Sequence, residues 1–119
     1  MTYVPYLDCC ATSPIESEVF EEMLQFLTED FGNSGSRTHE YGAVANRAVE
    51  RARKSVAKVV DSDPAEVLFT SGATESNNLV LLGIAKHGLS VGRQHIVSTA
   101  IEHKAVLEPL DELQKQGFK

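Results

Sequence analysis

A short β-rich run ends at small residues, and a helix-like segment follows at once; no other feature constrains this chain as strongly. The run covers residues 67–70, and Gly72, Ala73 and Thr74 come after it. The free N–H groups of a helix N-terminus can bind an anion in such a turn, small residues let it approach the backbone, and a hydroxyl adds a donor. The pattern predicts a phosphate-binding turn.

A purely structural role explains the same residues. Ser71 or Thr74 would cap the helix, and the carboxylate of Glu75 would lie in its first turn. The turn holds one glycine, so it is not the dinucleotide fingerprint, and no Gly-Lys-Ser/Thr sequence follows, so it is not a P-loop. Because a single Gly-Ala-Thr turn is weak evidence for a ligand, the spacing alone leaves both interpretations open.

A longer match distinguishes the phosphate-binding interpretation from the purely structural one. Phe-Thr-Ser-Gly-Ala-Thr-Glu-Ser-Asn-Asn at residues 69–78, with Glu-His-Lys-Ala-Val-Leu at residues 102–107, resembles the cysteine desulfurases, class V aminotransferase-like enzymes that use pyridoxal phosphate. Earlier in the chain, segments at residues 6–8, 11–14, 31–42 and 48–53 also resemble the family and stand in the family's order. The resemblance runs from about Tyr6 to the last residue and covers only the opening part of a family member.

The predicted elements alternate between helix and strand, which indicates an α/β fold. Apolar periodicity and β-branched runs predict helices over residues 15–29, 40–60, 75–87 and 104–116, and strands over residues 67–70 and 96–99. Gly88 and Gly117 are expected to close the last two helices, and Asp63-Pro64 to stop the second.

The resemblance implies fold type I of the pyridoxal phosphate enzymes, with a mixed seven-stranded sheet that is incomplete here. Residues 1–13 are then an N-terminal arm or small-domain segment, and residues 14–119 the start of the large cofactor-binding domain. In that sheet the two predicted strands are not neighbours, and the next strand would begin at residues 118–119. We therefore expect the chain not to fold alone. It would be an N-terminal piece, from a nicked or split enzyme, an incomplete sequence or a truncated reading frame.

Charge and hydropathy narrow the classes of partner. The formal net charge is −6 and no basic stripe is visible, which argues against direct binding to nucleic acid or to an anionic membrane. No apolar run could span a bilayer, and residues 1–5 have neither the basic nor the apolar region of a signal peptide. The expected location is the cytoplasm.

Cys9 and Cys10 are adjacent and are the only cysteines. Neighbouring cysteines rarely bridge each other, because the bond strains the peptide between them, and no metal site is expected. One of them could be the sulfur-accepting nucleophile. We favour small, partly buried side chains without that role, because the resemblance puts the nucleophilic cysteine far downstream.

The resemblance also assigns the candidate site residues. The N–H groups of Ala73 and Thr74, with the Thr74 hydroxyl, would hold the cofactor phosphate. His103 would stack on the cofactor ring and move protons, although a histidine at a helix start, held by a backbone carbonyl, is the structural alternative. His39 lies in a loop that the family places near the mouth of the site, where capping of the loop is an equally good explanation.

The implied function is that of a cysteine desulfurase, once the missing sequence completes it. L-cysteine becomes L-alanine, and an enzyme persulfide carries the sulfur to an acceptor in iron–sulfur assembly, RNA thiolation or DNA sulfur modification. A homodimer is implied. The Schiff-base lysine, the acidic partner of the ring nitrogen, the nucleophilic cysteine and the substrate-binding arginine have no counterpart here. Alternatives are a selenocysteine lyase, another class V pyridoxal phosphate enzyme, or a non-catalytic interaction module.

Overall fold

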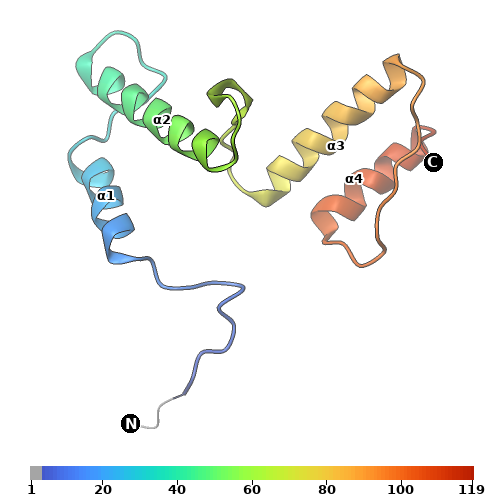
Figure 1. Ribbon diagram of the computed structural model, residues 1–119, viewed down its shortest axis with the longest axis horizontal. Coiled ribbons are helices and arrows are strands. Elements are labelled where there is room, and N and C mark those ends of the chain that lie inside the picture. Colours follow the sequence, from blue (N-terminus) through green and yellow to red (C-terminus); the bar gives the residue numbers. More distant parts are fainter. Residues whose placement is uncertain (1–3) are drawn as a thin grey trace. The chain divides into compact units, whose positions relative to one another are not determined.

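The computed structural model describes residues 4–119, and the chain divides into two compact units, Met1–Val67 and Leu68–Lys119 (Figure 1). Residues 1–3 lie outside the described residues. They belong to the predicted arm and to the stretch that shows no sign of a signal peptide. From residue 4 to residue 16 the chain has no helix or strand and is exposed. No helix among residues 4–119 has the length and apolar character needed to cross a membrane.

The first unit contains two helices, α1 (Ser17–Thr28) and α2 (Glu40–Val59), followed by the short 3-10 helix η1 (Pro64–Glu66). Both α-helices lie within two residues of their predicted bounds. After α2 the backbone turns through Asp61 at φ 52°, and Asp63 then caps η1 in a capping box with Glu66. The segment around Asp63-Pro64 thus interrupts helical structure, as predicted.

The loop before α2 is held tightly against the first turn of that helix. A Cβ on Gly42 would lie 2.3 Å from the carbonyl oxygen of Ser36, and one on Gly32 would lie 2.0 Å from that of Tyr41. Only glycine permits these two backbone approaches. The resemblance at residues 31–42 therefore covers a segment whose path depends on its glycines.

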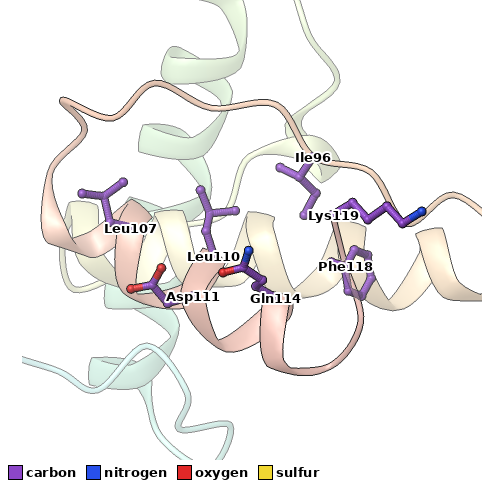
Figure 2. A pocket seen from close by; sticks show the side chains of 7 residues that line it. All are labelled: Ile96, Leu107, Leu110, Asp111, Gln114, Phe118 and Lys119. Atoms are coloured by element: carbon purple, nitrogen blue, oxygen red, sulfur yellow. The ribbon is translucent and has the colours of Figure 1, made fainter.

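The second unit pairs α3 (Ala73–Ser90) with α4 (Lys104–Lys115). Its core consists of Ala85, Leu113 and Phe118, with Ile96 and Leu110 packed against them. A cavity of about 220 Å³ lies along this core, and Figure 2 shows Leu110, Ile96 and Phe118 among the side chains that line it. The polar residues of the start of α3 do not line this cavity.

The two predicted strands do not form, and the predictions for residues 67–70 and 96–99 are wrong for this structure: residues 4–119 contain no strand. The backbone nevertheless shows where a sheet would start. Lys119 N–H donates to Gln94 O, and Ile96 N–H donates to Lys119 O, each at 2.8 Å. This exchange is the parallel-ladder pattern. A strand needs a hydrogen-bonded neighbour along its length, and these segments have no such neighbour among the described residues.

The glycines near the helix ends act differently from one another. Gly88 does not close its helix, because α3 begins at Ala73 and continues past Gly88 to Ser90. Gly88 is buried, and a Cβ there would lie 2.4 Å from the carbonyl oxygen of Arg93, so it lets the returning chain approach. Gly92, at φ 71°, makes the turn instead, whereas Gly117, at φ 95°, follows α4 as predicted.

Burial is sparse in both units. The buried apolar residues are Ala45, Ala57, Ala85, Ala105, Leu113 and Phe118, and no large side chain among the described residues is fully buried. Large apolar side chains are exposed instead, including Val97 at 88% and Ile101 at 93% of their surface. Soluble monomers seldom expose so much apolar surface. The described residues therefore lack the core of an independent domain.

We accordingly expect the purified 119-residue chain to unfold without a sharp transition. With so little apolar area buried, native packing gains too little free energy to offset the loss of conformational entropy. Differential scanning calorimetry, with dye binding to exposed apolar surface as a second probe, checks this. A cooperative transition of the monomeric chain would contradict it.

Candidate functional site

The start of α3 leaves its helix end open. Gly72 is the N-cap residue, and no side chain caps the helix there. The first N–H groups of a helix have no partner within the helix, so those of Ala73 and Thr74 remain available as donors. Thr74 is exposed, and its hydroxyl makes no hydrogen bond among residues 4–119. Ala73 and Thr74 therefore offer three donors at this helix end.

Neither backbone strain nor crowding requires a glycine at this N-cap. The φ of Gly72 is 161° and its ψ is −178°, an extended conformation that any residue adopts. A Cβ built on Gly72 would meet no atom within 4 Å. The structural alternative is wrong about the cap, which is Gly72 and not Ser71 or Thr74, but it is correct that Glu75 lies in the first turn of the helix.

Glu75 turns back toward the residue before the cap. One oxygen of its carboxylate accepts hydrogen bonds from the backbone N–H of Ser71 at 2.6 Å and from the Ser71 hydroxyl at 2.8 Å. The backbone bond, and then the hydroxyl bond, hold the pKa of Glu75 below its ordinary value. The carboxylate is thus committed to Ser71.

Further hydrogen bonds hold the turn in place. The hydroxyls of Thr70 and Ser76 lie 2.7 Å apart, and each is 3.2 Å from the carbonyl oxygen of Gly72. One turn along, the side-chain amide of Asn78 donates to the carbonyl oxygen of Thr74 at 2.8 Å. These contacts tie the carbonyl oxygens of Gly72 and Thr74 to side chains of the same segment.

The Glu75 carboxylate provides a prediction about pH. A carboxyl whose pKa is lower in the folded state adds stability above its unfolded pKa, and this stability is lost as the pH falls through the folded pKa. We therefore expect the Ser71–Glu75 bonds to persist below pH 4.5, the ordinary value of the group, and to break only in stronger acid. NMR titration of the Glu75 carboxyl carbon in the complete enzyme checks this. A midpoint at or above 4.5 would contradict it.

His103 is the N-cap residue of α4. Its Nδ1 accepts a hydrogen bond from the backbone N–H of Ala105 at 3.1 Å, and its side chain is exposed. Because Nδ1 is the acceptor, the neutral ring carries its proton on Nε2. The alternative interpretation of His103, a histidine at a helix start held by a backbone carbonyl, is therefore correct about the helix start. It is wrong about the partner, because the ring accepts from a backbone N–H. No hydrogen bond or ring contact joins it to Ala73 or Thr74 in the described part of the chain.

The weaker candidates have structural roles or none. His39 caps α2, with Nδ1 accepting from the N–H of Gly42 at 3.1 Å, which supports its loop-capping role. Cys9 and Cys10 are both exposed, so the expectation of partial burial is wrong. Among residues 4–119, no group of three His, Cys, Asp or Glu side chains is placed to hold a metal ion.

Sequence reasoning did not single out Ser71 as the partner of Glu75, nor the contact between Thr70 and Ser76. An acidic residue three positions after the N-cap is the usual sign of a capping box, and that sign was present. Its usual partner, a hydroxyl or carboxylate at the cap, was replaced by Gly72. The lack of a side-chain acceptor at Gly72 was therefore the signal in the sequence that could have indicated an uncapped helix end.

Comparison with known proteins identifies the class. The family model of aminotransferase class V matches residues 5–119. The chain is 50% identical over 114 residues to cysteine desulfurase IscS of Methylococcus capsulatus, covering 96% of this chain and 28% of that protein. Among solved structures, a NifS-like protein superimposes with a TM-score of 0.81 at 44% identity, over 92% of this chain and 29% of that one. DndA from Streptomyces lividans superimposes with a TM-score of 0.79 at 54% identity, over 97% of this chain and 32% of that one.

The chain belongs to the aminotransferase class V family. Within it, the relatives identify the sequence as one of the cysteine desulfurase family, corresponding to the N-terminal part of those proteins. The chain spans about 28% of the length of the curated relatives it matches. The solved neighbours confirm the predicted α/β fold class of fold type I, although the residues described here form helices only.

Proposed function

We propose that this chain supplies the phosphate-binding turn of a cysteine desulfurase that uses pyridoxal phosphate. The open N-terminus of α3 carries the proposal: the N–H groups of Ala73 and Thr74 and the Thr74 hydroxyl are donors, and Gly72 leaves the space before them empty. A phosphate dianion suits this donor set, because charge-assisted hydrogen bonds and the helix dipole both favour it. The donors and the open space fit the group.

His103 is proposed as the proton-handling residue. Its cap bond to Ala105 uses Nδ1 and leaves Nε2 as the free edge of an exposed ring. A fixed ring with one free nitrogen can donate or receive a proton at a defined point. Pyridoxal phosphate, when bound, supplies the electron sink for chemistry on an amino acid. We propose that Nε2 moves protons at the substrate.

The proposed reaction transfers one sulfur atom from L-cysteine. The C–S bond of the substrate breaks, a new S–S bond forms on a cysteine thiol of the enzyme, and L-alanine leaves, so an enzyme thiol becomes a persulfide and no external oxidant is needed. The nucleophilic thiol and the Schiff-base lysine would come from the remainder of the enzyme chain. Cys9 and Lys104 are residues of the same types within this chain. Neither stands in the family's motif for the nucleophilic cysteine or for the Schiff-base lysine.

Partners and organisation follow as proposals. We expect a homodimer and a sulfur-acceptor protein, in iron–sulfur assembly or another sulfur pathway. Residues 1–13 are proposed as an arm or small-domain segment, and residues 14–119 as the start of the large domain. The cytoplasm is the proposed location.

The test is product formation by the complete enzyme that carries this sequence. L-cysteine should yield alanine and a persulfide in equal amounts, and faster than selenocysteine yields alanine. Faster alanine release from selenocysteine would favour a selenocysteine lyase. If the complete polypeptide bound no pyridoxal phosphate and copurified with a partner that carries the missing lysine, the interaction module would replace our proposal.

A further inference from the structure

Cys9 and Cys10 form a pair of thiols that the proposed function leaves without a role. They fall between residues 6–8 and 11–14, two segments that resemble the family, so the pair is not part of that resemblance. Both cysteines are free and exposed. Cysteine sulfur, as the thiolate, is a nucleophile and a soft ligand. The chain thus presents two soft donors on consecutive residues.

The backbone holds the two thiols in a tight turn. The N–H of Ala11 donates to the carbonyl oxygen of Asp8 at 3.0 Å, and the N–H of Thr12 donates to the same oxygen at 3.4 Å. The first of these bonds makes Cys9 and Cys10 the central residues of a β-turn. Both side chains therefore start from one short segment whose ends are tied together.

Two ordinary fates of a cysteine pair do not suit this turn. The α-carbons of consecutive residues lie about 3.8 Å apart, whereas disulfides usually join α-carbons about 4.4–6.8 Å apart, so a direct bond between the sulfurs is strained. A structural zinc ion takes four protein ligands, and among residues 4–119 no three His, Cys, Asp or Glu side chains are grouped to hold a metal. A fitting ligand is soft and bridges the sulfurs through one atom with only two protein donors.

We propose that Cys9 and Cys10 together form a binding site for trivalent arsenic that carries one organic group. Such an arsenic atom makes three single bonds, one to its organic group and two to the adjacent sulfurs. With an arsenoxide, the two S–H bonds and the arsenic–oxygen bond break, two As–S bonds form, and the oxygen leaves with both protons as water. Arsenic stays trivalent, so no oxidant or reductant takes part. The proposal does not depend on the proposed function, because it needs the two thiols alone.

Adjacency is what gives this site its affinity. Once one sulfur has bound the arsenic, the second As–S bond forms within the molecule, and the neighbouring thiol is present at an effective concentration on the order of millimolar or more. A single thiol lacks this advantage and loses the arsenic to competing thiols. We therefore expect the pair to hold the arsenical about 10²-fold or more tightly than either cysteine alone.

The test uses phenylarsine oxide and the complete enzyme that carries this sequence. Affinity is read by mass spectrometry from the arsenic on the peptide that contains residues 9–10, at increasing concentrations of a competing monothiol. Cys9→Ser and Cys10→Ser are matched to each other, because each keeps one thiol, and both positions are exposed, so serine disturbs no packing. The double variant Cys9→Ser/Cys10→Ser shows what the rest of that peptide binds.

In the wild type we expect one arsenic on this peptide with both thiols blocked, and in each single variant a loss of affinity of about 10²-fold or more. The double variant should carry no arsenic there. A smaller loss in either single variant overturns the inference, and so does arsenic in the wild type that is bound only to other cysteines. Failure of residues 9–10 to react in the complete enzyme also overturns it, because the site requires both thiols to be accessible.

Discussion

Replacement of His103 with alanine in the complete enzyme is expected to leave the cofactor bound and to lower turnover of L-cysteine by about 10²-fold or more. The free Nε2 of the wild-type ring is the proposed proton carrier, and alanine offers no group in its place. The measurement is kcat from alanine release, together with the absorbance of bound cofactor. Wild-type turnover in this variant would remove the assignment.

A second variant separates proton transfer from helix capping, because His103 also caps α4 through Nδ1. Alanine loses that cap, at a cost of about 1 kcal/mol. His103→Asn restores an excellent cap but does not titrate. If the histidine moves protons, His103→Asn should remain as slow as His103→Ala while recovering its thermal stability. Recovery of turnover in the asparagine variant would assign the histidine a structural role only.

Replacement of Thr74 with valine is expected to weaken retention of pyridoxal phosphate by about tenfold or more. Valine keeps the shape of threonine but removes one charge-assisted hydrogen bond, worth about 1.5–3 kcal/mol. The affinity is measured by dialysis of the complete enzyme against known cofactor concentrations. Unchanged affinity would count against the phosphate-binding turn.

Thr74→Ser is the matched control for this variant. Serine keeps the hydroxyl and loses only a methyl group, and Thr74 is exposed, so packing changes little. We expect the serine variant to retain cofactor nearly as well as wild type. Equal losses in Thr74→Ser and Thr74→Val would show that the hydroxyl alone does not account for the effect, which would contradict the account.

The helices were predictable from the sequence because each carries its own local signals. α2 begins at Glu40, as expected, and α4 begins at Lys104 and ends before Gly117, as expected. The end of α3 was not predictable, because Gly88 is an ordinary stop signal in the sequence. Its role depends on Arg93, whose carbonyl oxygen returns close to the helix, and a local pattern does not report such a tertiary contact.

The two β-rich runs, at residues 67–70 and 96–99, do not form the predicted strands here. Strand structure depends on neighbours, and among residues 4–119 only Lys119 makes such backbone bonds at the start of the second run, with Gln94 just before it and with Ile96. These two bonds are compatible with the prediction that the next strand would begin at residues 118–119, which stays a prediction. Helices form their hydrogen bonds internally, which explains why they are present and the strands are not.

The candidate site was predictable as a location but not as a geometry. The string around Thr74 marked the turn, and the comparisons confirm the family that it indicated. The sequence did not reveal that Glu75 bonds Ser71 or that His103 bonds Ala105, because both depend on the side-chain directions at a helix start. Local capping rules alone would have assigned a side-chain cap that the structure does not have.

The crystal structure of the complete enzyme with pyridoxal phosphate is the most direct test. The account predicts phosphate oxygens within hydrogen-bonding distance of the N–H groups of Ala73 and Thr74, in the space in front of Gly72. A phosphate bound elsewhere, with this helix end covered by packed side chains, would contradict it.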